Sequence, residues 1–244
     1  MAQYTILSTK KISPALKTAL EEKSIELLEQ EFIAIKELYN KEKHEEVFPW
    51  ITKEGETAVV FTSRHAVACI TKHLHADDTF YVPDQWQIFC LSGATQEEVL
   101  KRHDEKQIAG TATNAAGLAN CIINNGSFKE VVFFCGNKRR DELPDLLAEN
   151  GITVHEVVVY ETIETPQVAT GDPDAVLFFS PSASESFFSV NKLNPDTPCF
   201  AIGDTTAQAI ARFTSNRIIT SELPSQEMML ASVVFYLQNI DQYK

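Results

Sequence analysis

Short apolar runs alternate with amphipathic stretches along the whole chain. Residues 131–135, VVFFC, form an uninterrupted apolar run, and such runs are typical of parallel strands that are buried on both faces. Residues 14–23 have apolar positions at helical spacing, with Ser13 as the expected N-cap and Pro14 at the first helical position. The regular alternation predicts an α/β fold built on parallel sheets.

The same pattern of apolar and polar positions predicts strands and helices along most of the chain. Strands or extended segments are predicted at residues 4–8, 25–36, 57–62, 87–91, 107–110, 131–135, 152–163, 175–179, 199–202 and 217–219. Helices are predicted at residues 14–23, 64–74, 95–103, 113–124, 141–149, 182–190, 205–213 and 225–238.

An internal repeat relates the two halves of this pattern. Residues 90–100 match 200–210, and residues 108–122 match 218–234, both at an offset of 110 residues. Residues 58–67 also match 175–184, and the first strand and helix resemble the stretch that begins at residue 131. Because separate segments share one offset, we expect a duplicated α/β unit.

Most predicted strands end in a turn that is rich in hydroxyl groups or glycine. In open parallel sheets, ligands bind outside the carboxyl ends of the strands, and helix N-termini there attract anions. Two such rims facing one another would make a cleft lined with hydroxyls, amides and a few cations. Each serine or threonine alone is better explained as a helix N-cap, so the case for ligand binding rests on the whole set of turns.

Charge and composition narrow the function classes. The chain has 244 residues and a formal net charge of −13, which excludes non-specific binding to nucleic acid or anionic membranes. No signal pattern or membrane-length apolar run is present, and five widely spaced cysteines indicate reduced thiols. We therefore expect a cytoplasmic protein. Walker A and dinucleotide fingerprints and a metal-ligand set are missing, so we expect no cofactor and no metal.

One cationic cluster and one tyrosine are the strongest chemical signals. Residues 136–140, GNKRR, place positive charge at a predicted helix N-terminus, where the helix dipole disfavours it. Either the cluster binds a polyanion or it is a solvated first turn. Tyr160 ends the apolar run HEVVVY, where its phenol either donates a proton or packs on the sheet.

Four stretches in order carry a resemblance to a known family. They are FTSRHAV, CGNKRRDELPDLLAENGITVHEVVVYET, VLFFSPSASESF and AIGDTTAQAI. In this order they resemble uroporphyrinogen-III synthases, over roughly residues 4–235. The resemblance implies two α/β domains joined by a two-stranded β linker. One domain would comprise residues 1–36 and 168–244, the other residues 40–163, with linker strands at about 25–38 and 152–167, and the protein would be a monomer.

The implied reaction closes hydroxymethylbilane, a linear polycarboxylate tetrapyrrole, into uroporphyrinogen III during haem biosynthesis. Ring D is inverted and water is lost, so the enzyme would be a lyase. Such a site needs orientation and anion binding more than a strong acid or base. The family's tyrosine maps to Tyr160, which we expect to act as general acid or as hydrogen-bond donor to the departing oxygen.

The same resemblance carries over a set of substrate-binding candidates in the strand-end turns. They are Lys10, Lys11, Thr62, Ser63, Arg64, Gly93, Thr111, Gly136, Asn137, Lys138, Arg139, Ser180, Ser182, Gly203, Thr205 and Thr206.

Four positions depart from the family's pattern. Lys10 and Lys11 stand where many relatives carry Thr-Arg, so the charge is kept but the bidentate fork is lost. His65 stands where Asn is usual, and Gln96 stands where the second repeat has Thr206.

Two other functions remain open at this point. A hinge-closing binding protein for a small anionic metabolite would also use paired α/β domains, although it usually carries a secretion signal or a DNA-binding segment. A nucleotide-sugar transferase would use paired domains too, although this chain is short for one and has no phosphate-loop signature. Isomer analysis after incubation with hydroxymethylbilane discriminates the synthase from both.

Overall fold

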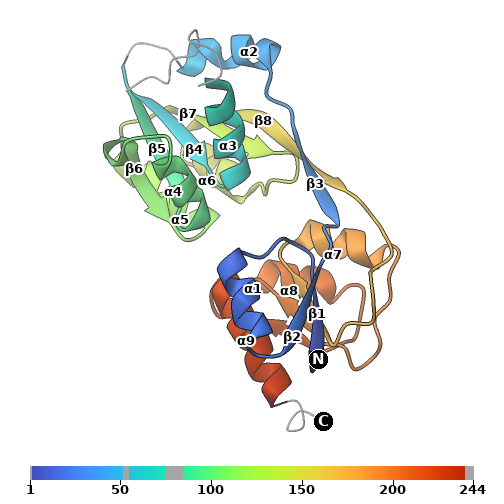
Figure 1. Ribbon diagram of the computed structural model, residues 1–244. Coiled ribbons are helices and arrows are strands. Elements are labelled where there is room, and N and C mark those ends of the chain that lie inside the picture. Colours follow the sequence, from blue (N-terminus) through green and yellow to red (C-terminus); the bar gives the residue numbers. More distant parts are fainter. Residues whose placement is uncertain (1, 52–54, 75–84, 240–244) are drawn as a thin grey trace. The chain divides into compact units, whose positions relative to one another are not determined.

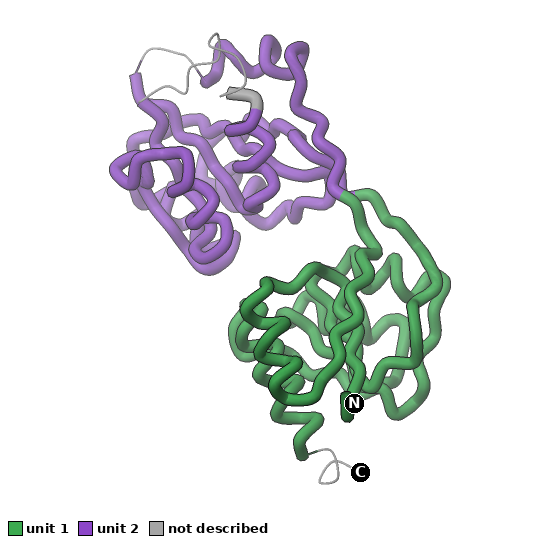
Figure 2. Tube along the Cα trace, in the orientation of Figure 1, with its two compact units in different colours: residues 1–34, 163–244 green, residues 35–162 purple. Residues whose placement is uncertain are grey.

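The chain divides into two compact units, one of which is built from both chain ends (Figure 2). The computed structural model describes residues 2–51, 55–74 and 85–239. Unit 1 comprises Met1–Ala34 and Ile163–Lys244, and unit 2 comprises Ile35–Thr162. The division falls inside two strands, β3 (Ile33–Glu37) and β8 (Thr153–Glu164), which are neighbours in one sheet and connect the units.

Unit 1 has a five-stranded sheet with the order β11-β10-β9-β1-β2. Its edge strand β2 lies beside β1 in Figure 1. All four strand pairs are parallel. The strands are β1 (Tyr4–Ser8), β2 (Ile25–Glu29), β9 (Ala175–Phe178), β10 (Cys199–Ala201) and β11 (Ile218–Thr220). The helices are α1 (Pro14–Glu21), α7 (Pro181–Phe188), α8 (Asp204–Ile210) and α9 (Gln226–Gln238).

Both faces of this sheet are covered, which explains why its strands β9 and β10 are apolar throughout. Along β1, Ile6 packs in a core with residues of α1 and α9, whereas Leu7 packs in a second core with residues of α7 and α8. Successive side chains of a strand point to opposite faces, so each strand contributes to both cores.

Unit 2 has a six-stranded sheet with the order β3-β8-β7-β4-β5-β6, and its pairs from β8 to β6 are parallel. Its other strands are β4 (Thr57–Phe61), β5 (Trp86–Leu91), β6 (Ile108–Ala112) and β7 (Glu130–Gly136). Its helices are α2 (Lys41–Ile51), α3 (Arg64–Leu74), α4 (Ala94–Leu100), α5 (Ala115–Asn125) and α6 (Glu142–Glu149), with a short 3₁₀ turn at Glu105–Gln107. Along β7, Phe133 and Phe134 enter opposite cores.

The two sheets repeat one strand order. The order β11-β10-β9-β1-β2 of unit 1 corresponds to β6-β5-β4-β7-β8 of unit 2. The sequence repeat predicts that β9 corresponds to β4 and β10 to β5, since residues 175–184 match 58–67 and residues 200–210 match 90–100. The predicted fold class, two parallel-sheet α/β domains with an internal duplication, is confirmed.

The structure refines several expected boundaries. The extended segment predicted at 25–36 consists of two strands, β2 and β3. The turn between them contains Phe32, whose side chain is fully buried. All five residues of β2 pair with β1, so this part of the expected linker 25–38 belongs to the sheet of unit 1. Helices predicted at 95–103 and 205–213 end earlier, at Leu100 and Ile210. The helix α2 was not predicted.

Helix lengths and hydropathy also bear on membranes. Within the part of the chain that the structure describes, none of the helices has both the length and the apolar character needed to cross a bilayer.

Candidate active site

Tyr160 lies in the second half of β8, beside Gly136 at the end of β7. The register between the two strands shifts at Cys135 and Gly136, which brings Tyr160 opposite the glycine. The Tyr160 hydroxyl donates a 2.9 Å hydrogen bond to Ser63 Oγ, in the turn after β4. Three neighbouring strands of one sheet, β8, β7 and β4, therefore bring these groups together at the edge where β7 and β4 end.

Gly136 is needed for the position of the tyrosine ring. A Cβ atom at residue 136 would lie 2.4 Å from Cζ of Tyr160 and 2.7 Å from its hydroxyl oxygen, far inside van der Waals contact. Asn137 holds the strand directly after the ring, because its backbone N–H donates to the Tyr160 carbonyl and its Oδ1 accepts from the N–H of Thr162. The ring is thus fixed by space and by backbone contacts together.

The environment of Tyr160 keeps its phenol protonated. Burial raises the pKa of the Tyr160 hydroxyl above its ordinary value, and the hydrogen bond with Ser63 opposes this shift only in part. A protonated phenol near neutral pH is a hydrogen-bond donor and a weak acid.

Ser63 connects the Tyr160 hydroxyl to the backbone after β4. Its Oγ accepts from Tyr160 and also from the backbone N–H of His65, at 3.2 Å. A serine hydroxyl has one donor hydrogen and two acceptor positions, so Ser63 keeps its own hydrogen for a further partner. The His65 ring lies 5.7 Å from the Tyr160 ring, centroid to centroid.

A cavity of about 360 Å³ opens beside these groups. Six of the predicted site residues line it, together with unpredicted Arg140. They are Thr62, Ser63, Gly136, Lys138, Arg139 and Tyr160. The lining combines a phenol, hydroxyls, three cationic side chains and one acidic side chain, Glu142. The cations outnumber the acid, which suits an anionic ligand that needs a proton donor.

The three cations of this cavity differ in their surroundings. Arg139 forms ion pairs with both Asp141 and Glu156 and is mostly buried. These carboxylates offset its charge and tie the β7–α6 turn to β8. Lys138 and Arg140 are exposed, so they extend toward solvent at the same turn.

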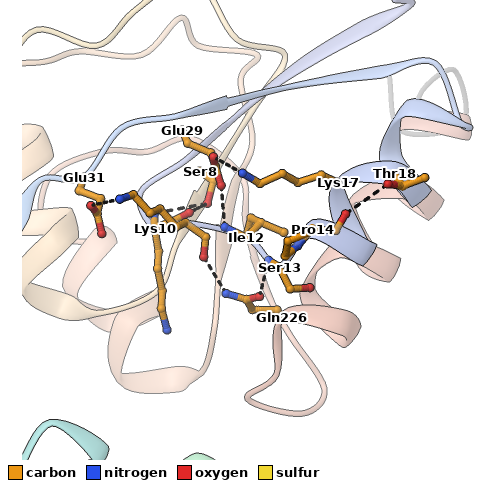
Figure 3. A network of polar contacts seen from close by, with 11 residues as sticks. Ser8, Lys10, Ile12, Ser13, Pro14, Lys17, Thr18, Glu29, Glu31 and Gln226 are labelled. Atoms are coloured by element: carbon orange, nitrogen blue, oxygen red, sulfur yellow. Dashed lines mark hydrogen bonds and ion pairs between the residues drawn. The ribbon is translucent and has the colours of Figure 1, made fainter. Parts of the chain in front are cut away.

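Unit 1 carries a second set of predicted residues, in the turn between β1 and α1 (Figure 3). Lys10 Nζ lies 5.6 Å from the centre of the Phe179 ring, a cation–π contact. Lys11 lies 3.8 Å from the carboxylate of Glu31, and both side chains are exposed. The hydroxyl of Ser8 bonds both the N–H and the carbonyl of Lys10, which fixes that residue's backbone.

A family comparison identifies the chain at this point. The model of the family described as uroporphyrinogen-III synthase HemD matches residues 14–231. The chain belongs to the uroporphyrinogen-III synthase HemD family. It functions as a uroporphyrinogen-III synthase, a hydro-lyase of tetrapyrrole biosynthesis, and the family implies hydroxymethylbilane as substrate. This finding decides against the binding protein and the sugar transferase.

Relatives and solved structures agree with this family. A curated uroporphyrinogen-III synthase from Chlorobaculum parvum is 28% identical over 173 residues, which cover 63% of this chain and 69% of the relative. The uroporphyrinogen-III synthetase of Helicobacter pylori has the same fold, with a TM-score of 0.67 at 17% identity over 96% of this chain and 99% of that one. A mutant synthase from Thermus thermophilus gives a TM-score of 0.65 at 15% identity, over 98% of this chain and 99% of that one.

The remaining predicted residues of this uroporphyrinogen-III synthase lie in other turns. In unit 2, among the described residues, Arg64, Gly93 and Thr111 are not part of the cavity lining. Gly93 has φ 76°, a left-handed conformation that favours glycine for backbone reasons alone. These three residues therefore stay separate from the Tyr160 cavity.

The unit 1 candidates of α7 and α8 have mixed surroundings. Ser180 is the N-cap of α7 and accepts from the N–H of Ala183, while Ser182 lies half-buried in the same first turn. Gly203 precedes α8 with an extended backbone that any residue adopts, and Thr206 is buried. Thr205 beside it is half-buried. Ser180 thus acts as the cap that its sequence position also predicted.

Several cavity residues escaped sequence reasoning. Thr113 and Asn114 line the cavity from the turn after β6, where Asn114 also caps α5 through the N–H of Gly117. The turn signal TATN was present in the sequence, but only Thr111 was selected from it. Arg140 belongs to the cationic run GNKRR, which was predicted as a cluster, although Arg140 was not among the individual candidates.

Metal chemistry has no visible support in these surroundings. Across residues 2–51, 55–74 and 85–239, no group of three or more histidine, cysteine or acidic side chains is placed to hold a metal ion.

Proposed function

We propose that this synthase cyclises hydroxymethylbilane with inversion of ring D and loss of water, and that Tyr160 protonates the departing hydroxyl group. One observation carries the proposal: the protonated phenol of Tyr160 lines a cationic cavity and is held by Ser63 and Gly136. A general acid must lie within hydrogen-bond reach of its acceptor, and a fixed ring in a cavity wall meets that need.

The substrate supplies both the leaving group and the electron pair that this proton transfer requires. The bond between the terminal methylene carbon and its hydroxyl oxygen breaks, and the oxygen leaves as water with the proton from Tyr160. The pyrrole nitrogen supplies the electron pair, so the substrate becomes a cation while the tyrosine becomes a phenolate. In this step the phenol hydrogen turns from Ser63 Oγ to the departing oxygen, and the Ser63 hydroxyl then donates to the phenolate. Ring closure forms a carbon–carbon bond at the cationic methylene carbon and releases one proton from the attacking pyrrole carbon, which returns the phenolate to the phenol.

Carboxylates of the substrate are bound by the turns at the strand ends. In unit 2, Lys138 and Arg140 are the exposed cations at the cavity, and Thr62 and Ser63 offer hydroxyls. Arg139 donates Nε–H to Glu156 and an Nη1–H to Asp141, so its remaining N–H groups contribute to the lining. Asn137, with Gly136, positions the Tyr160 strand.

Unit 1 supplies further candidates for carboxylate binding. Lys10 and Lys11 supply positive charge from the turn after β1, and Ser182 and Thr205 supply hydroxyls from the first turns of α7 and α8. The backbone amides of Ser180 and Gly203 lie at the same helix starts. Arg64, Gly93, Thr111 and Thr206 are kept as peripheral candidates.

The oligomeric state and the compartment are proposals that start from the family and from the cysteines. From the membership in this family we propose that the enzyme works as a monomer, which size-exclusion chromatography with light scattering tests. All five cysteines are free thiols, which favours a reducing compartment and supports a cytoplasmic location.

Turnover of Tyr160→Phe tests the proposal. Enzymatically generated hydroxymethylbilane is supplied, and the products are oxidised and separated by isomer. We expect the type III product to form at least about 10² times more slowly than with the unchanged chain, the lower range for loss of a general acid. Tyr4→Phe, a half-exposed tyrosine at the start of β1, is the control and should keep full turnover. Equal turnover by Tyr160→Phe would remove the phenol from the chemistry.

A further inference from the structure

The turn that carries Lys10 and Lys11 is held at its start by its own side chains and at its end by side chains from distant parts of unit 1 (Figure 3). At its start, Thr9 Oγ1 donates to the Leu177 carbonyl at 2.9 Å, and its backbone N–H bonds the same carbonyl. Ser8 bonds both backbone groups of Lys10. This half of the turn is therefore fixed by the sheet.

The second half of the turn depends on two side chains. Glu29, the last residue of β2, accepts the N–H of Ile12 at 2.6 Å and also pairs with Lys17. Gln226 accepts the N–H of Ser13 on Oε1 at 3.2 Å and donates from Nε2 to the Lys11 carbonyl at 3.0 Å. One amide group thus bridges the residues on either side of Ile12, across more than 200 positions of sequence.

Gln226 is not needed to start the helix that carries it. It is the first residue of α9, and the N-cap Ser225 already accepts the N–H of Met228. The Gln226 side chain is instead turned to the β1–α1 turn, as Figure 3 shows. A half-exposed glutamine with both amide atoms committed to one backbone segment fixes that segment's conformation.

We propose that Gln226 is a positioning residue that holds the β1–α1 turn in the conformation from which Lys10 and Lys11 bind substrate carboxylates. The inference rests on the proposed role of the two lysines. A flexible turn must be ordered when the substrate binds, and this ordering weakens binding. Because carboxylates far from the reacting carbon are bound equally before and during the reaction, the effect falls on KM and not on kcat.

Two substitutions at residue 226 separate the roles of the amide. Gln226→Met keeps the side-chain length and removes both hydrogen bonds. Gln226→Glu keeps an acceptor for the Ser13 N–H but sets a carboxylate against the Lys11 carbonyl. Gln238→Met is the matched control, since Gln238 is exposed at the other end of the same helix.

Steady-state kinetics with hydroxymethylbilane should show a change in KM without a change in kcat. We expect Gln226→Met to raise KM about fivefold, the scale of one lost net hydrogen bond, with kcat unchanged and the Gln238→Met control unaltered. Gln226→Glu should raise KM at least as much. The increase of KM with salt should keep its slope in Gln226→Met, because the lysine charges remain, and should flatten in the Lys10→Ala/Lys11→Ala variant.

The lysine variant separates failure of the inference from failure of its premise. If Lys10→Ala/Lys11→Ala raises KM and Gln226→Met does not, the positioning role is wrong while the lysines keep theirs. If Gln226→Met raises KM equally in the variant without lysines, Gln226 acts elsewhere and the inference is also wrong. If the lysine variant itself keeps the original KM, the binding role of this turn and the inference both fail, while Tyr160 turnover tests the proposed chemistry separately.

Discussion

Replacing Gly136 by alanine would place a methyl group against the ring of Tyr160. The new carbon would lie 2.4 Å from Cζ, 2.6 Å from Cε2 and 2.7 Å from the hydroxyl oxygen. The ring must therefore move by about 1 Å to reach ordinary van der Waals contact. Such a shift lengthens the 2.9 Å hydrogen bond to Ser63 beyond useful range.

The expected consequences of Gly136→Ala are a slower enzyme and a less stable fold. A displacement of about 1 Å at a reacting group costs on the order of 10²-fold in rate, and overpacking costs about 1 to 3 kcal/mol of unfolding free energy. Turnover of hydroxymethylbilane to the type III isomer measures the first effect, and urea unfolding measures the second.

Two further variants make the result of Gly136→Ala specific. Gly151→Ala, where φ is 72° and a Cβ meets open space, should lose about 1 kcal/mol through backbone strain and keep its turnover. In the Tyr160→Phe background, Gly136→Ala should cause little further loss of rate, because the phenol is already absent. Gly136→Ala with unchanged turnover and unchanged stability would refute the packing argument.

Three other variants test separate parts of the account. Ser63→Ala removes the acceptor of the Tyr160 hydroxyl and should lower kcat about 5- to 10-fold with a small change in melting temperature; an unaltered kcat would show that Ser63 only caps α3. Lys138→Ala should raise KM and flatten its dependence on salt, whereas unchanged kinetics would place this lysine outside the binding surface. Burial alone would raise the pKa of Glu29, but the hydrogen bonds from Lys17 and the Ile12 amide outweigh it and hold that pKa below its ordinary 4.5. The stability that Glu29 contributes is thus present above pH 4.5 and is lost as the pH falls through its folded-state pKa; Glu29→Gln should flatten this acid limb in unfolding titrations, and an unchanged limb would contradict the assignment.

The sequence predicted most strands because they are buried on both faces. Residues 131–135 are apolar without interruption, since β7 lies between two cores in the middle of its sheet. The repeat then placed β9 and β10 in positions that correspond to β4 and β5. By contrast, α2 carries Pro49 in its interior and has a charged first half, so no clear helical pattern marks it.

The candidate site was predicted in its parts but not in its contacts. Tyr160 and Ser63 are 97 residues apart, and their hydrogen bond depends on the register shift at Gly136. The cluster at residues 136–140 was found by its charge. The compensation of Arg139 by Glu156 depends on the neighbouring strand β8, which the local sequence does not reveal. The contact of Gln226 with the β1–α1 turn is equally non-local.

The central claim is that Tyr160 donates a proton to the departing hydroxyl group. Changing the acidity of the Tyr160 phenol tests this claim most directly. Incorporating 3-fluorotyrosine at position 160 lowers the pKa of the phenol while keeping its size nearly unchanged. A general acid works only while protonated, so activity should fall as the pH rises through the tyrosine pKa. The account predicts that this alkaline limb of kcat moves to lower pH in the fluorinated enzyme, after the spontaneous type I product is subtracted. An identical pH profile for the two enzymes would contradict it.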